Sequence, residues 1–238
     1  MSSRLVAVTY DAGDPAGLAS FWGSLLDREV LREARGALLP GEETQVALRF
    51  VAAPPGRSGP DRLHLHLTSS SGSDQVKTVA RALALGGRHL DVGQLPEEGH
   101  VVLADPEGHA FCVIEAGNQF LAGCGYLGEV SWEGSRGVGL FWREALGWPL
   151  VWDQDEETAI QSLAGGTKLS WGGPPFPPKG ARNRQRFDLE AFDLEEEVVR
   201  LVALGATRLG DRDDGVELSD PDGNEFRVLP TATRGLDR

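Results

Sequence analysis

An α+β fold built from two similar halves is predicted by three short patterns that each occur twice in the 238-residue chain. The repeated patterns are Phe21-Trp22 and Phe141-Trp142, VARALALGG (79–87) and VVRLVALGA (198–206), and DPEGHAF (105–111) and DPDGNEF (220–226). They keep the same order and nearly the same displacement, which indicates a duplication. The small, glycine-rich stretch AGNQFLAGCG (116–125) separates the copies. We therefore expect two domains, at residues 1–117 and 125–232.

The first half contains two units in which an apolar strand precedes an amphipathic helix. They are the strand LVAVTY (5–10) with a helix over about residues 14–26, and the strand RLHLHL (62–67) with a helix over about residues 73–85. Asp14 and Pro15 are typical of the N-cap and first residue of a helix, and Gly86-Gly87 is typical of a helix end.

The second half repeats this order. Its units are the strand GEVSW (128–132) with a helix over about residues 136–146, and the strand RFDLEAF (186–192) with a helix over about residues 194–204. Two or three further strands follow each helix, so we expect four strand-helix-strands modules. The DPEG and DPDG patterns fit type I turns that join the last two strands of each half, with Asp first, Pro second and Gly fourth.

Polar side chains occupy one face of the predicted strands. Because side chains alternate along a strand, the leucines of RLHLHL share one face and the histidines share the other. The open-face residues at matching positions of the two halves are His64, His66, Cys112, Arg186, Asp188 and Arg227. A curved sheet whose other face is covered by helices presents these residues in a concave cup, the usual place for a small-molecule site.

The duplicated FW helices, the R-x-His strand, the ALG helix end and the DP(E/D)G(H/N)xF hairpin resemble the glyoxalase, bleomycin-resistance and extradiol-dioxygenase superfamily, also called vicinal oxygen chelate. The resemblance covers about residues 4–116 and 126–230. It implies tandem glyoxalase-like domains, each with two βαβββ modules that form a curved mixed sheet with helices on the outer face. It implies much less about chemistry, because one fold hosts many activities.

Metal-dependent members of this superfamily bind a divalent ion through a His or Gln on the first strand, a His on the fifth and a Glu on the last. In the first half these positions are about Ala7, His64 and Cys112. Only His64 is a ligand of the family's type, and it would need His66 with Asp11 or Glu115 to complete a site. The alternative is that both histidines only line the cup.

In the second half the same positions fall near Leu127, within about two residues, and at Arg186 and Arg227. All five histidines lie in the first half, and two arginines bring permanent positive charge to the place of a cation. We therefore expect no cofactor in the second cup, and in the first cup a divalent metal only if His64 binds it.

Several residues have both a ligand-binding and a structural interpretation. Arg186 and Arg227 either bind a carboxylate or phosphate or pair with Asp188, Glu190 or Glu225. Cys112 is either a nucleophile or a small buried side chain. The tryptophans near strand ends in the second half either form stacking walls for a planar ligand or pack in the core. They are Trp132, Trp152 and Trp171.

Two proline-rich loops occupy matching places in the halves, PPGRSGPD (54–61) and WGGPPFPPKGARNR (171–184). They are typical of stiff crossovers between modules. The second, through Phe176 and Lys179, is also a candidate rim for a cup.

Composition limits the partners. A formal net charge of −13 and a pI of about 4.8 argue against nucleic acid, whose binding requires clustered Lys and Arg. The N-terminus lacks a basic segment followed by an apolar run, and no stretch is apolar enough for a membrane span, so we expect a cytoplasmic protein that does not contact a membrane. Two cysteines imply no disulfide framework. We expect a monomer or a homodimer.

These observations predict a metal-independent protein that binds, and sequesters, an aromatic or anionic metabolite or antibiotic in the second cup. The alternative is a divalent-metal-dependent lyase, isomerase or dioxygenase of the superfamily with its site in the first cup. Whether the chain is an enzyme stays open at this point, and so does the identity of the small-molecule ligand.

Overall fold

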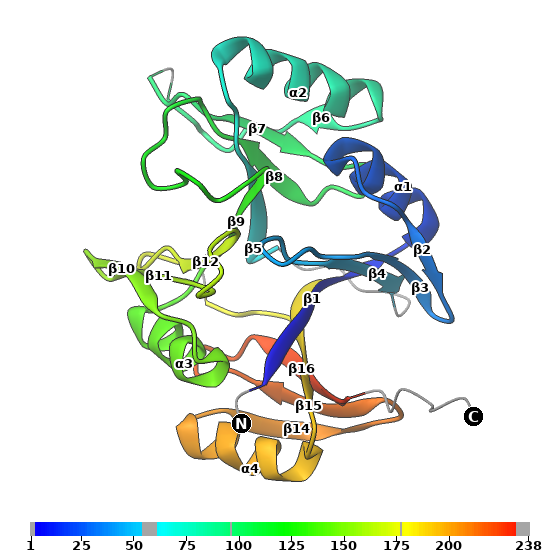
Figure 1. Ribbon diagram of the computed structural model, residues 1–238, viewed down its shortest axis with the longest axis vertical. Coiled ribbons are helices and arrows are strands. Elements are labelled where there is room, and N and C mark those ends of the chain that lie inside the picture. Colours follow the sequence, from blue (N-terminus) through cyan, green and yellow to red (C-terminus); the bar gives the residue numbers. More distant parts are fainter. Residues whose placement is uncertain (1–2, 54–60, 96, 177, 232–238) are drawn as a thin grey trace.

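The computed structural model describes residues 3–53, 61–95, 97–176 and 178–231, which form four successive βαβββ modules (Figure 1). Module 1 contains β1 (Arg4–Ala12), α1 (Pro15–Leu26), β2 (Leu31–Glu33), β3 (Gly36–Leu39) and β4 (Leu48–Ala52). Module 2 contains β5 (Leu63–Leu67), α2 (Gly72–Ala84), β6 (Arg88–His89), β7 (Val101–Ala104) and β8 (Ala110–Val113). The predicted strand and helix order of the first half is confirmed.

The second half has the same order. Module 3 contains β9 (Leu127–Trp132), α3 (Arg136–Leu146), β10 (Leu150–Gln154), β11 (Glu157–Gln161) and β12 (Lys168–Trp171). Module 4 contains β13 (Gln185–Ala191), α4 (Leu194–Leu204), β14 (Thr207–Arg212), β15 (Gly215–Ser219) and β16 (Glu225–Pro230). The duplication predicted from the repeated patterns is therefore visible in the structure.

The first helix begins at its predicted cap. The Asp14 side chain accepts a hydrogen bond from the Gly17 N–H at 3.0 Å, and Pro15 is the first residue of α1. Side chains cap the other helices in the same way, at Ser71, Ser135 and Asp193. No helix in the described part of the chain has the length and apolar character needed to cross a membrane.

The modules pair across the halves to form two eight-stranded sheets. The terminal sheet joins modules 1 and 4 in the order β14-β15-β16-β13-β1-β4-β3-β2, and the central sheet joins modules 2 and 3 in the order β10-β11-β12-β9-β5-β8-β7-β6. The α+β class and the two curved mixed sheets are confirmed. The expectation that each cup is built from the two modules of a single half is wrong, because each sheet joins one module of the first half with one module of the second half. We call the concave face of the terminal sheet the terminal cup and that of the central sheet the central cup. In Figure 1 these concave faces are turned to the right and to the left, respectively.

The two modules of one half are held together through their helix-covered faces instead. In the first half the Trp22 indole N–H donates to the Asp105 carboxylate at 3.1 Å, and the Trp22 ring lies 5.0 Å from the Phe111 ring. In the second half Trp142 and Asp220 make the same hydrogen bond at 3.2 Å. Because these faces already contact each other, the free edge of each first strand pairs with a module of the other half. This pairing is β1 with β13 and β5 with β9, both antiparallel.

The repeated DP(E/D)G pattern has a structural role. One oxygen of Asp105 accepts the backbone N–H groups of Glu107 and His109, while the other accepts the Trp22 indole N–H. Asp220 binds the equivalent groups of its own turn and Trp142. Each Asp therefore fixes a hairpin turn and attaches it to the first helix of its half.

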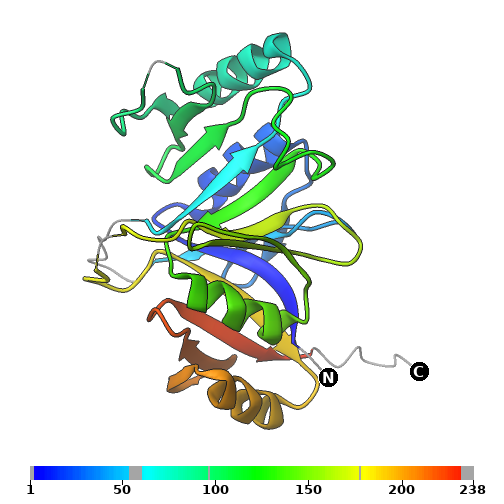
Figure 2. The same ribbon diagram turned by 90° about the vertical axis from the view of Figure 1, so that its left-hand side faces the viewer.

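One hydrophobic cluster contains buried residues of all four modules. Figure 2 shows α2 and α4 at opposite ends of the long axis of the molecule. Leu63, Leu65 and Leu67 belong to the cluster, as the alternation in β5 predicted. Trp132 of module 3 packs against Phe187 of module 4, with ring centroids 5.3 Å apart. The cups are the opposite faces of the two sheets, so their polar side chains are supported by one rigid core.

We expect Trp142→Phe to lower the free energy of unfolding by about 1–3 kcal/mol, because Asp220 then keeps a buried carboxylate oxygen without its indole donor. Urea denaturation measures this change. Trp152→Phe is the matched control, since Trp152 is partly exposed and lies outside the core cluster. Equal losses in the two variants would show that the hydrogen bond to the turn contributes nothing specific.

Candidate functional site

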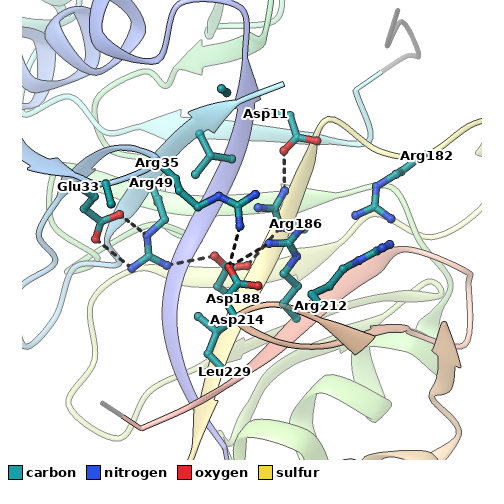
Figure 3. Close-up of a pocket in the computed structure, with 14 residues that line it drawn as sticks. Asp11, Glu33, Arg35, Arg49, Arg182, Arg186, Asp188, Arg212, Asp214 and Leu229 are labelled. Carbon is teal, nitrogen blue, oxygen red and sulfur yellow. Dashed lines mark hydrogen bonds and ion pairs between the residues drawn. The ribbon is translucent and has the colours of Figure 1, made fainter. Parts of the chain in front are cut away.

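The terminal cup holds a cavity of about 560 Å³ lined by charged side chains (Figure 3). Six arginines line it: Arg35, Arg49, Arg182, Arg186, Arg212 and Arg227. Four acids line it: Asp11, Glu33, Asp188 and Asp214. In a protein with a net charge of −13, this cup concentrates positive charge.

Strand register brings the floor of the cavity together. β1 pairs with β13 so that Thr9 lies opposite Arg186, and β13 pairs with β16 so that Asp188 lies opposite Arg227. The Arg186 guanidinium donates to Asp11 at 2.7 Å, and its Nε lies 3.3 Å from Asp188. These three charged side chains are almost fully buried, so each depends on the others for its counter-charge.

Asp188 collects donors from three strands. Its Oδ2 accepts the Thr9 hydroxyl at 2.6 Å and the Arg49 guanidinium at 3.1 Å. Arg49 donates its remaining groups to Glu33. Asp188 therefore anchors Thr9 and Arg49 through Oδ2, while its Oδ1 lies 3.3 Å from the Arg186 Nε and has no hydrogen-bond partner in the described part of the chain.

Arg227 is the arginine whose counter-charges are least well placed. Its Nη1 lies 3.6 Å from Asp214, its Nε lies 3.9 Å from Glu217, and the Nε atom is buried with no hydrogen-bond partner in the described part of the chain. Burial and the nearby Arg186 guanidinium lower the pKa of Arg227. A half-buried guanidinium that lies beside a second one and has no close carboxylate can accommodate an anion as a further partner.

The rim of the cup comes from the loop before β13 and from the β14–β15 hairpin. Arg182 and Arg212 both form ion pairs with the buried Glu217. The proline-rich loop 171–184 thus contributes Arg182 to the cavity. Phe176 and Lys179, the two residues of this loop predicted to form the rim of a cup, do not line the cavity. Lys179 pairs with Glu225 at 2.6 Å, and Phe176 packs under Arg62. The matching loop at 54–60 is outside the described residues.

The central cup has a different set of side chains. Glu129 on β9 lies opposite His66 on β5, and His66 lies opposite Cys112 on β8, so the three form a row across adjacent strands. The His66 Nδ1 shares a hydrogen bond with Glu129, and the His64 ring lies 4.7 Å from the His66 ring. Potential ligand atoms of His64, His66 and Cys112 all lie within 4.8 Å of one another.

The two histidines have opposite pKa shifts. Burial and the neighbouring His66 lower the pKa of His64 to about 4. Burial would also lower the pKa of His66, but hydrogen bonding to Cys112 and Glu129 outweighs it and raises this pKa to about 10. His64 is therefore a neutral imidazole at physiological pH, while His66 holds the proton it shares with Glu129.

The linker between the halves fills much of the central cup. Leu121 and Cys124 are buried in a small cluster with Cys112 and its strand neighbours. Phe120 stacks edge-on against Trp152, and the Lys168 ammonium lies 4.1 Å from the centre of the Phe120 ring. A hollow of about 350 Å³ remains between Phe120, Trp152 and Glu129, so this cup is narrower than the terminal one.

The structure separates the residues predicted to share the second cup. Arg186, Asp188 and Arg227 meet in the terminal cup, as the face assignment predicted. The tryptophans do not join them, because β9, β10 and β12 belong to the central sheet. Trp132 packs in the core, while Trp152 and Trp171 border the central hollow. The expectation of arginine and tryptophan walls in one cup is therefore wrong.

The predicted completion of a metal site also needs correction. Asp11 and Glu115 were the alternative acids that could join His64 and His66. Asp11 lies in the terminal sheet and accepts from Arg186, and Glu115 accepts from Asn118. The first-strand position in the same row as His66 and Cys112 is Glu129, on the first strand of module 3. The sequence analysis does not identify it, because it assigns all three ligand positions of a cup to one half of the chain. Alternation in GEVSW, with Glu and Ser between Val and Trp, was the available signal for this open-face carboxylate.

Only one cup has donors that fit the divalent ion used by metal-dependent members. In the terminal cup the equivalent row is Ala7, Asp188 and Arg227, which offers one carboxylate, already bonded, beside a guanidinium. That row does not fit a cation. In the central cup two imidazoles and a thiol converge, and the Glu129 carboxylate lies against one of the imidazoles; imidazole and thiol ligands suit borderline ions.

The fold and the two cups define a tandem protein of the vicinal oxygen chelate class. A family model described as the glyoxalase-like domain matches residues 7–114 and 132–229. These segments cover most of the chain, so the protein belongs to the glyoxalase-like domain family. A comparison with curated proteins returns no match.

Solved structures with the same fold span nearly the whole chain. Glyoxalase I from Zea mays is 16% identical, with a TM-score of 0.66 over 96% of this chain and 92% of that chain. A candidate dioxygenase from Bacillus subtilis is 13% identical, with a TM-score of 0.62 over 96% of this chain and 85% of that chain. At these identities the similarity is one of fold.

We expect Arg227→Met to leave the free energy of unfolding unchanged or to raise it, because the wild-type guanidinium is poorly paired and close to Arg186. Arg186→Met is the contrasting variant and should cost about 3–5 kcal/mol, since it removes a buried guanidinium that lies between the buried carboxylates of Asp11 and Asp188. Urea denaturation compares the two. A loss at Arg227 as large as that at Arg186 would identify Arg227 as a structural ion pair.

Proposed function

We propose that the protein binds a small organic anion, a carboxylate or phosphate, in the terminal cup without a metal ion. The observation that carries this proposal is the Arg227 guanidinium, which lines the cavity and whose nearest carboxylates lie 3.6 and 3.9 Å away. An anion in the cavity can accept a charge-assisted hydrogen bond from this guanidinium. This keeps the anionic part of the ligand predicted from the sequence and does not support the aromatic part.

The surroundings of Arg227 favour an anion of modest size. The cavity volume of about 560 Å³ lies in the range of small-molecule sites. Val51 and Leu229 provide an apolar patch in the same cavity, where the carbon skeleton of the ligand can rest. Arg186 and Arg49 are fixed by Asp11, Asp188 and Glu33, so the floor is organised before the ligand arrives.

A binding experiment tests the proposal. Benzoate, succinate and inorganic phosphate are screened by thermal shift, and every hit is measured by calorimetry. We expect at least one to bind, and Arg227→Met to weaken it by about tenfold or more, the effect of losing one good charged hydrogen bond.

Arg143→Met is the matched control, because Arg143 is a partly exposed arginine of α3 outside the cavity. It should leave the affinity unchanged. If Arg227→Met leaves the affinity of every hit unchanged, the assignment of the ligand to the terminal cup is wrong.

A second function, divalent-metal-dependent chemistry in the central cup, is favoured by the row Glu129, His66 and Cys112 with His64 beside it. A bound ion would act as a Lewis acid that polarises an oxygen of a substrate. His64, being neutral, offers a free ring nitrogen, and Cys112 offers a sulfur ligand where metal-dependent members of the superfamily have a carboxylate.

Cobalt spectroscopy tests the metal candidate. Stoichiometric Co²⁺ bound here should give an intense near-ultraviolet sulfur-to-cobalt charge-transfer band, and Cys112→Ser should remove it. Cys124→Ser is the control, since Cys124 is the other buried free cysteine and is not in the His64 cluster. Absence of the band, or its loss in the Cys124 variant alone, would contradict this assignment.

A further inference from the structure

Asp214 lies at the mouth of the terminal cup, in the two-residue turn of the β14–β15 hairpin, where Arg212 pairs with Gly215. Its Oδ2 lies 3.4 Å from the Arg35 Nη1 and 3.6 Å from the Arg227 Nη1. One carboxylate oxygen therefore lies between two guanidinium groups, one from module 1 and one from module 4.

The two contacts are longer than good charged hydrogen bonds, which span about 2.7–2.9 Å. The Asp214 side chain is 43% exposed and Arg35 is 68% exposed, so water competes for both. Asp11 and Asp188 are buried and closely bonded, and the partly exposed Glu33 accepts two hydrogen bonds from Arg49. Asp214 is thus the acid that can leave the cavity at the smallest cost.

We propose that Asp214 is an internal competitor that occupies the anion position beside Arg227 and moves aside, with the β14–β15 turn, when the ligand binds. This inference rests on the proposed function, because the displaced carboxylate and the ligand use the same arginine. The same movement breaks the Arg35–Asp214 contact, which connects the β2–β3 turn with the β14–β15 turn across the cup mouth (Figure 3). Asp214 consequently determines both the affinity of the terminal cup for its anion and how readily that anion enters the cup.

Asp214→Asn and Asp213→Asn form a matched pair. Both remove one negative charge from the same turn, but Asp213 is exposed and does not line the cavity. Calorimetry with succinate and inorganic phosphate should show affinity about tenfold higher in Asp214→Asn, the gain expected when a competing charged contact is removed. Asp213→Asn should change affinity by less than about twofold, because exposed charges are screened by water and salt.

A measurement without ligand accompanies the titration. Hydrogen exchange of the backbone amides in β14 and β15 should become faster in Asp214→Asn than in the wild type, and stay unchanged in Asp213→Asn. Equal affinities, or equal exchange rates, in Asp214→Asn and Asp213→Asn would overturn the proposal that Asp214 competes with the ligand. Weaker binding in Asp214→Asn would also overturn it and would make Asp214 part of the ligand contact.

The two proposals fail in different ways. If the wild type binds a probe and Arg227→Met abolishes that binding, but the Asp214 and Asp213 variants behave alike, only the competitor is wrong. If no probe binds the wild type or Asp214→Asn, the terminal cup is not an anion site and both proposals are wrong. Binding that appears only in Asp214→Asn supports both.

Discussion

The antiparallel contact between β1 and β13, repeated between β5 and β9, determines which side chains meet in this molecule. It places Asp11 of the first module beside Arg186 of the last one, and Glu129 beside His66. Without this contact neither cup has a complete floor. The contact is possible because the helix-covered faces of each half are already joined by the Trp–Asp hydrogen bonds, which leaves the first strands with free edges.

The elements of the fold could be predicted from the sequence because their signals are local. Caps such as Asp14, the alternation in RLHLHL and the Asp-Pro turns each act within a few residues. The partner of each module could not be predicted, because pairing within a half and pairing across halves use the same strand patterns. That ambiguity explains why Arg186 and Arg227 were placed correctly on an open face while Glu129 was missed.

The two cups differ in how their charge is balanced. In the terminal cup arginines outnumber the lining acids, and the surplus is concentrated at Arg227, whose pKa is lowered by burial and by Arg186. In the central cup His66 and Glu129 pair closely, and the linker occupies much of the remaining volume. Equivalent strands of one fold therefore present an electropositive cavity on one side and a nearly neutral, imidazole- and thiol-containing site on the other.

The crossed assembly of the modules has a further consequence for how such a chain can change over time. Two identical, unfused halves arranged in this way would form a symmetric pair with two equal cups, so any substitution would alter both at once. Fusion into one chain removes that constraint, because the terminal and central sheets share no strand. The binding residues of one cup can then change while those of the other cup stay the same. Arg227 and Cys112 occupy equivalent positions on the last strands of the two halves, and their difference is the result expected from such independent divergence.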